Sequence, residues 1–169
     1  MRAKKFTAAV VMAAIAAIGF APLANAAVRP TTAQKLQLQY LIEEEKLARD
    51  VYLYLAANVT TSKFSNIARS EQTHMDQIAA VLKTYNYFNP TTTRAAGVFR
   101  DKSLQALYNT LIAQGSVDVA AAMQVGRDIE NLDIKDLQVM LKATMPADMK
   151  LALDNLLKGS YNHLAAFSR

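Results

Sequence analysis

The sequence contains no cysteine. A chain without thiols forms no disulfide bond, and it offers no thiolate for a structural zinc site or an iron–sulfur cluster. Any metal ion would therefore have to be held by carboxylate oxygens and by imidazole nitrogens. The chain has two histidines, His74 and His163.

The sequence also lacks a block of basic residues, and aromatic residues do not alternate with lysine or arginine. The formal net charge of +5 falls to +2 for residues 27–169, which hold 16 basic and 14 acidic residues. The overall basic character therefore says little about partners, and nucleic-acid binding has no support.

Glycine and proline are scarce, with four glycines and three prolines beyond residue 26. Few helix breakers and long apolar periods predict an all-α domain. Helices are expected over residues 32–57, from 61 or 62 to 85, 116–143 and from 147 to about 167. A short helix, capped by Asp101 or Ser103, is expected to end at Gly115. The tight connection at 58–61 and the long irregular stretch at 86–100 predict a four-helix bundle with a short extra helix in its one long crossover.

The first 26 residues have the pattern of a secretory signal peptide. Arg2, Lys4 and Lys5 precede an apolar run from Phe6 to about Leu23, and Ala24-Asn25-Ala26 is a small-x-small cleavage signal. The alternative is an uncleaved membrane anchor, since the run is nearly long enough to span a bilayer. Cleavage near Ala26 is the prediction, which leaves a single domain over residues 27–169, exported to the periplasm or secreted and free of the membrane.

Polar residues interrupt the apolar stripe of the second expected helix. At alternating steps of three and four residues the stripe reads Phe64, Ile67, Glu71, His74, Ile78, Val81 and Tyr85. Glu71 and His74 lie three residues apart and therefore on one face. A carboxylate in a core costs several kcal/mol, roughly, unless a proton, a partner or a metal ion compensates it.

The other three long helices show the same interruption near their middle. Glu45 interrupts the stripe of the first helix, and Glu44 lies on a neighbouring stripe that is nearly as apolar, so both remain candidates. Glu130 and Asp133 interrupt the helix over 116–143. The last helix places Ser160 and His163 on its stripe.

Pooled, these positions give four carboxylates and two imidazoles: Glu45, Glu71, His74, Glu130, Asp133 and His163. This is the ligand count of a di-iron or di-manganese carboxylate centre in a four-helix bundle. Hard oxygen donors with imidazole suit iron or manganese, and zinc is also compatible. Glu71 and Glu130 are expected to bridge two cations, and Glu45 to bind one of them.

The segments around these residues resemble a known family. Glu45-Lys-Leu-Ala-Arg-Asp-Val-Tyr52 is similar to the first-helix motif of rubrerythrin-type ferritin-like proteins, and Phe64-Ser-Asn-Ile-Ala-Arg-Ser-Glu71-Gln-Thr-His74-Met resembles their second-helix motif. With Gly97-Val-Phe99, the run from Ile129 to Leu137 and the run from Gly159 to Phe167, the chain resembles a bacterial exported ferritin-like family of unknown function over about residues 36–168.

The resemblance implies Glu45, Glu71, His74, Glu130 and His163 as metal ligands. It also exposes a departure, because ferritin-like proteins with a full site have Glu-x-x-His on the last helix and Ser160 stands here in the place of the glutamate. The second metal position is therefore in doubt. Asp133, one turn from Glu130, is a candidate for the missing carboxylate, with an outer-shell partner and a surface aspartate as alternatives.

The leading functional hypothesis is an exported protein with two iron or manganese ions that reacts with dioxygen or peroxide. Two alternatives remain: metal storage or buffering without catalysis, and a structural or interaction bundle whose site has degenerated, which the serine at 160 favours. A homodimer is compatible with the sequence. Three further interpretations need no metal ion. Glu71 and His74 would form a hydrogen-bonded pair, residues 43–45 would be a solvated run of charges, and Tyr52 would be a core residue that can donate a hydrogen bond to the site.

Overall fold

The structure is a computed structural model that describes residues 28–59 and 61–169. This part of the chain contains five helices and no strand: α1 (Thr32–Asn58), α2 (Lys63–Thr84), α3 (Lys102–Gly115), α4 (Val119–Met140) and α5 (Ala147–Phe167). The predicted signal peptide lies outside the described residues. None of the helices that are described has the length and hydropathy of a membrane span.

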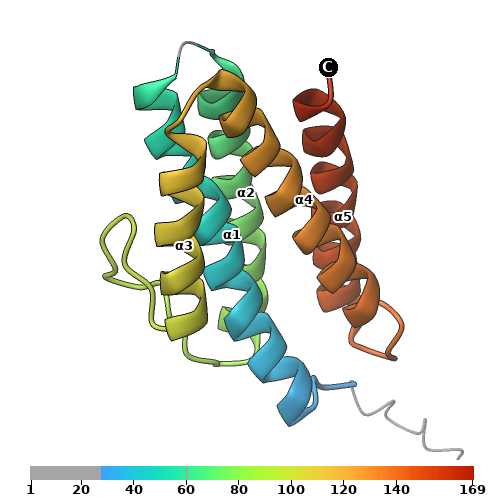
Figure 1. Cartoon of the computed structure of the whole chain (residues 1–169). Coiled ribbons are helices and arrows are strands. Elements are labelled where there is room, and N and C mark those ends of the chain that lie inside the picture. Colours follow the sequence, from blue (N-terminus) through green and yellow to red (C-terminus); the bar gives the residue numbers. More distant parts are fainter. Residues whose placement is uncertain (1–27, 60) are drawn as a thin grey trace, which may run out of the picture.

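Four of the helices form a bundle of two hairpins (Figure 1). Helix α1 packs against α2, α2 against α5, α5 against α4, and α4 against α1, so each long helix has two neighbours. Helix α3 belongs to the connection between the hairpins and packs on α1 and α4. The predicted all-helical architecture, with its short extra helix, is confirmed.

The ends of the helices follow their capping residues. Asp101 caps α3, because its side chain accepts from the amides of Ser103 and Leu104, which settles the choice left open by the sequence. Helix α4 begins three residues later than predicted, since the Asp118 side chain accepts from the Ala121 amide and fixes the start there. It ends at Met140 rather than 143, before the turn that leads to Pro146.

The interior has two hydrophobic clusters with a polar layer between them. One cluster holds the inward-facing apolar residues between Leu47 and Leu55 of α1, those at the start of α2, in α3 and in the first half of α4, and Phe167. The other holds Leu38, Leu41 and Ile42 of α1 with apolar residues from the second half of α2, the end of α4 and the first half of α5. The buried polar side chains between them are Glu43, Glu44, Glu45, Lys46, Glu71, His74, Glu130, Asp133, Ser160 and His163. Most of the buried charge of the described residues therefore lies at one level of the bundle, and Asp50 lies one turn further along α1.

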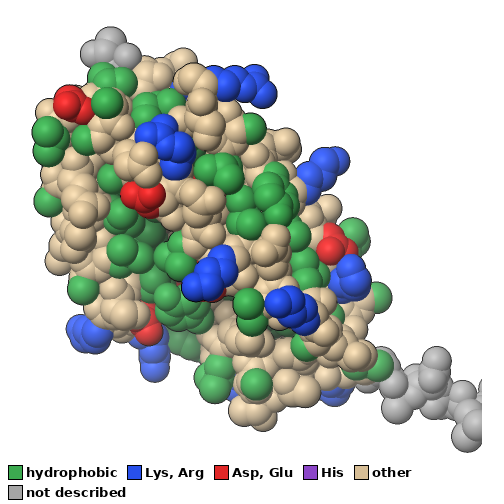
Figure 2. All heavy atoms as spheres, turned by 45° about the vertical axis from the view of Figure 1, so that its right-hand side comes forward, with side chains coloured by type: hydrophobic (Ala, Val, Ile, Leu, Met, Phe, Trp, Pro, Cys, Tyr) green, Lys and Arg blue, Asp and Glu red, His purple; other side chains and the backbone are tan. Residues whose placement is uncertain are grey.

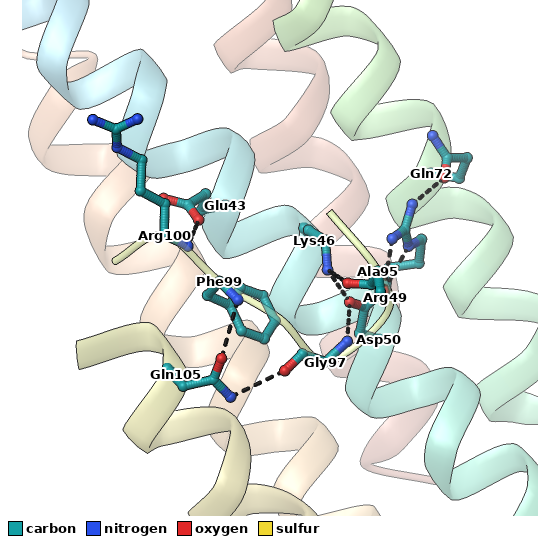
Figure 3. A network of polar contacts seen from close by, with 10 residues as sticks. All are labelled: Glu43, Lys46, Arg49, Asp50, Gln72, Ala95, Gly97, Phe99, Arg100 and Gln105. Atoms are coloured by element: carbon teal, nitrogen blue, oxygen red, sulfur yellow. Dashed lines mark hydrogen bonds and ion pairs between the residues drawn. The ribbon is translucent and has the colours of Figure 1, made fainter. Parts of the chain in front are cut away.

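The long connection between α2 and α3 is tied to α1 by a buried ion pair (Figure 3). The Lys46 ammonium pairs with the Asp50 carboxylate and donates to the Ala95 carbonyl at 2.9 Å. Asp50 also accepts from the Gly97 amide at 2.8 Å. Gly97 has a φ of +72°, a conformation that favours glycine, so the chain can turn back at this point.

The expectation that residues 43–45 form a solvated charge run is wrong, because all three glutamates are buried. Glu43 accepts from the backbone amides of Arg100 and Asp101, which the connection brings over this face of α1 (Figure 3). The connection therefore covers Glu43, and its own backbone amides provide the hydrogen bonds of that carboxylate.

Candidate metal centre

The polar layer brings together five of the six predicted ligands. Two sets of three residues each offer ligand atoms that all lie within 4.8 Å of one another. The first set is Glu45, Glu71 and His74, from α1 and α2. The second is Glu71, Glu130 and His163, from α2, α4 and α5. Both sets are buried groups of the kind that could hold a metal ion.

Glu71 belongs to both sets and turns one oxygen to each imidazole. Its Oε2 lies 2.8 Å from Nδ1 of His74, and its Oε1 lies 2.8 Å from Nδ1 of His163. The two imidazole rings stack with centroids 5.4 Å apart. Glu45 Oε2 approaches the first imidazole at 3.2 Å, and Glu130 Oε2 approaches the second at 3.5 Å. The arrangement has two similar halves that share one carboxylate.

Glu130 belongs to the second set alone, whereas Glu71 belongs to both. The Tyr52 hydroxyl donates to Glu130 Oε1 at 2.6 Å, which occupies the oxygen on the side away from His163. Tyr52 is fully buried in the hydrophobic cluster that contains Phe167. Tyr52 therefore has both roles that the sequence suggested for it: it packs in the core, and it donates a hydrogen bond to the site.

Two residues behind the imidazoles determine how the rings are placed: Ser70 behind His163 and Gly159 behind His74. His163 Nε2 lies 2.9 Å from the Ser70 hydroxyl, so its Nδ1 is left to face the carboxylates. A Cβ at Gly159 would lie 2.3 Å from His74 Nε2, so the imidazole fits only because residue 159 has no side chain. Sequence reasoning missed both residues. An isolated glycine inside a long helix was the available signal for Gly159, whereas nothing in the sequence marks Ser70.

The charges of the site depend strongly on one another. Burial works to lower the pKa of both imidazoles, but the facing carboxylates outweigh it and raise the pKa of His74 to about 11 and that of His163 to about 10. Burial raises the pKa of Glu45 and of Glu130 to about 8. It acts in the same direction on Glu71, yet the two imidazoles lower the pKa of that carboxyl to about 2. Protons therefore neutralise the excess negative charge of the site.

Several of the facing atoms are close without being hydrogen-bonded. Glu71 Oε1 and His163 Nδ1 have no hydrogen-bond partner although they are 2.8 Å apart, and Glu45 Oε1 has none either. Buried polar atoms without partners are rare because each costs free energy. A cation can replace the protons that otherwise balance these converging oxygen and nitrogen atoms, so the donor set fits a metal site.

Asp133 lies outside both sets, and it is not the surface aspartate that the sequence left open. It is buried, and one of its oxygens pairs with the Ser160 hydroxyl while Oδ1 has no partner. The same hydroxyl donates to the Leu156 carbonyl at 2.9 Å. A serine has one proton to donate, so the pair is satisfied when Asp133 is protonated; burial raises the pKa of this carboxyl well above its ordinary value.

The alternative of Glu44 in place of Glu45 is decided by the geometry. Glu45 is in the first set and Glu44 is in neither. Glu44 is nevertheless buried, and no hydrogen bond reaches either of its carboxylate oxygens.

The family and the relative that match this chain are both described as uncharacterized. Residues 34–169 match the family described as "Uncharacterized protein domain (DUF2202)". "Uncharacterized protein MJ0754" of Methanocaldococcus jannaschii is 45% identical over 127 residues, which are 75% of this chain and 69% of that protein. The crystal structure of hypothetical protein MJ0754 superimposes with a TM-score of 0.79 at 42% identity, over 82% of this chain and 79% of that one.

Proposed function

Because the chain belongs to this family of uncharacterized domains, its function has to be argued from the site, and we propose that it is an exported ferritin-like protein with a di-metal carboxylate centre. Iron or manganese would be the resident metal, with zinc as a competitor, and the activity would be of the oxidase or peroxidase type. The observation that carries the proposal is Glu71, which turns one oxygen to each of two similar sets of ligands.

The five candidate ligands would form two metal positions that share Glu71. Glu45 and His74 would hold the first ion, Glu130 and His163 the second, and Glu71 would bridge them. Each position then has three protein ligands, fewer than iron or manganese takes, and room remains for small exogenous ligands. The second position lacks the carboxylate that a residue at 160 could supply, because Ser160 binds Asp133 instead.

The burial of the site limits what it could act on. All five ligands are at most 7% exposed, and on the face drawn in Figure 2 no histidine reaches the surface. A pair of iron(II) or manganese(II) ions would supply two electrons to dioxygen or to hydrogen peroxide, which are small enough to enter. The imidazoles and Tyr52 would keep the carboxylates in place, and the surrounding hydrophobic clusters would exclude bulk water.

Metal binding without redox turnover is the second candidate function. The observation that favours it is the incomplete ligand set at Ser160, which leaves the second position one carboxylate short of a full site. A protein of this kind would buffer or carry ions.

The test is the stoichiometry of iron(II) bound under anaerobic conditions. We expect two ions per chain in the wild type, about one in Glu45→Gln and in Glu130→Gln, and a loss of both in Glu71→Gln. Asp154→Asn, at an exposed carboxylate paired with Lys150, is the control and should bind two. The loaded protein is then exposed to dioxygen or peroxide, and iron(III) is followed by its absorbance.

Three results would change the proposal. A wild type that binds no iron, manganese or zinc would contradict the metal centre. Equal losses in Glu71→Gln and Glu45→Gln would contradict the bridging role of Glu71. Two bound ions that stay reduced in dioxygen and in peroxide would leave the second candidate, metal binding alone.

A further inference from the structure

Glu44 is a buried carboxylate of the polar layer that neither the metal centre nor a hydrogen bond accounts for. Its side chain is 4% exposed, and neither of its oxygens has a hydrogen-bond partner. A buried acid with two unpaired oxygens lowers the free energy of unfolding, so its presence calls for a compensating role.

Glu44 lines a surface cavity between α1 and α4. The cavity has a volume of about 400 Å³, and its lining includes Glu44 of α1 with Asp136 and Val139 of α4. Its walls are mainly apolar, and its two acidic side chains come from opposite helices. Apolar walls strengthen the field of the charges between them, which raises the local concentration of cations.

Carboxylates continue from this cavity to the metal centre. On α4, Asp136, Asp133 and Glu130 follow one another at steps of three residues, so each lies beside the next on the helix surface, with a rise of about 4.5 Å and a turn of about 60° per step. Asp136 is half-buried, whereas the other two are buried. Asp133 lies within electrostatic range of both Glu44 and Glu45.

We propose that the cavity between α1 and α4 is the uptake route for divalent cations, with Asp136 and Glu44 as transient ligands and Asp133 as the step to Glu45. The inference rests on the proposed function, because it needs a metal centre to fill. The orphaned oxygens of Glu44 and the unpaired Oδ1 of Asp133 are then the groups that the passing ion contacts.

The spacing of these carboxylates suits passage rather than storage. Within the described residues, Glu44, Asp133 and Asp136 do not form a set of ligand atoms within 4.8 Å, in contrast to the two sets around Glu71. An ion would therefore keep part of its water shell along the route and would be held weakly until it reaches Glu45. A change in the route should alter the rate of loading and leave the final occupancy unchanged.

The first test uses Co²⁺, whose visible absorbance appears on binding to oxygen and nitrogen ligands. Metal-free protein is mixed with Co²⁺ in a stopped-flow instrument, and the final stoichiometry is measured after equilibration. We expect Glu44→Gln to load at least about ten-fold more slowly than the wild type and to reach the same stoichiometry. Asp128→Asn removes an exposed carboxylate from α4 away from the cavity and should load at the wild-type rate.

The second test places a positive charge at the mouth of the cavity. Val139, which lines the cavity and is 53% exposed, and Val119, which is 46% exposed, lie on the same helix about 30 Å apart. Val139→Lys should slow loading by about ten-fold at low ionic strength, whereas the charge of Val119→Lys is beyond the screening length and should have no effect. These are surface substitutions, so they test the route even if Glu44→Gln fails to fold.

The outcomes separate this inference from the proposed function. A wild-type loading rate in both Glu44→Gln and Val139→Lys, or equal slowing by Val139→Lys and Val119→Lys, would overturn the route. A lower final stoichiometry in Glu44→Gln would make Glu44 a ligand of the centre and would also overturn it. Failure of the wild type to bind Co²⁺, iron or manganese at equilibrium would overturn the proposed function, and the route with it.

Discussion

At the scale of single residues, the absence of a side chain at position 159 matters most. Gly159 lies inside α5, where alanine would favour the helix by about 1 kcal/mol. The added methyl group would nevertheless lie 2.3 Å from Nε2 of His74, and the imidazole is enclosed by Glu45 and Glu71 on its other side. Steric conflict at the site therefore outweighs the gain in helix propensity.

We predict that Gly159→Ala lowers metal affinity by about 10- to 100-fold, because His74 has to leave its place facing the carboxylates. Manganese or cobalt content after dialysis measures the loss. Gly115→Ala is the matched control, since its methyl group would lie 2.8 Å from Leu55, away from the ligands; it should retain full metal content. An unchanged metal content in Gly159→Ala would show that His74 is not a ligand.

At the scale of the elements, a buried ion pair of α1 anchors the middle of the connection between α2 and α3 at Ala95 and Gly97. The chain offers two lysine–aspartate pairs at a spacing of four residues: Lys46–Asp50 is buried, and Lys150–Asp154 is exposed. Removing one partner of a buried pair leaves an uncompensated charge, which costs about 3–5 kcal/mol. An exposed pair at this spacing contributes about 0.3–0.5 kcal/mol.

We therefore predict that Asp50→Ala lowers the free energy of unfolding by about 3–5 kcal/mol and that Asp154→Ala lowers it by less than about 1 kcal/mol. Denaturant unfolding of both variants measures the difference. Asp50→Ala should also speed hydrogen exchange of the Gly97 amide, which loses its acceptor. Similar values for the two variants would mean that the buried pair does not hold the connection.

At the scale of the whole molecule, the site makes stability depend on pH. In the folded, metal-free protein Glu45 and Glu130 keep their protons up to about pH 8, and the imidazoles keep theirs up to about pH 10 or 11. The unfolded chain loses these protons near 4.5 and 6.5. The folded state thus binds more protons from about pH 5 upward, and its stability falls as the pH rises. Glu71 acts only below its unfolded pKa, where its stabilising effect is lost as the pH falls toward 2.

We predict that the melting temperature of the metal-free protein is lower at pH 8.5 than at pH 5.5 by at least about 5 °C. Metal binding displaces the same protons, so the metal-loaded protein should show the opposite trend and the gap between the two should widen with pH. Calorimetry of both forms across this range measures it. A metal-free protein that grows steadily more stable from pH 5.5 to 8.5 would contradict the charge state described for the site.

Sequence periodicity was sufficient to identify the helices and the polar residues on their inward faces. Glu45, Glu71, His74, Glu130 and His163 could be found in this way because each interrupts an apolar stripe at the same level of the bundle. Periodicity places a side chain on a face, but it does not say which oxygen faces which partner. For that reason the contacts of Glu71 with both imidazoles, and the hydrogen bond from Tyr52 to Glu130, had to come from the structure.

The residues around position 43 show a second limit of the same kind. A row of charges on a helix is solvated unless another part of the chain covers it, and here the covering segment lies about 50 residues away. The spacing of Lys46 and Asp50 and the glycine at 97 were visible in the sequence, but their contact depends on the course of an irregular segment. No local pattern predicts such a course.

In the proposed centre one carboxylate, Glu71, serves both metal positions, and this has a consequence for how the protein responds to metal supply. When the first ion draws Glu71 into place, it fixes the second oxygen of that side chain as well and removes part of the ordering cost for a neighbour. Occupancy should therefore change in pairs over a narrow range of concentration, so that the protein responds to a threshold of free metal rather than in proportion to it.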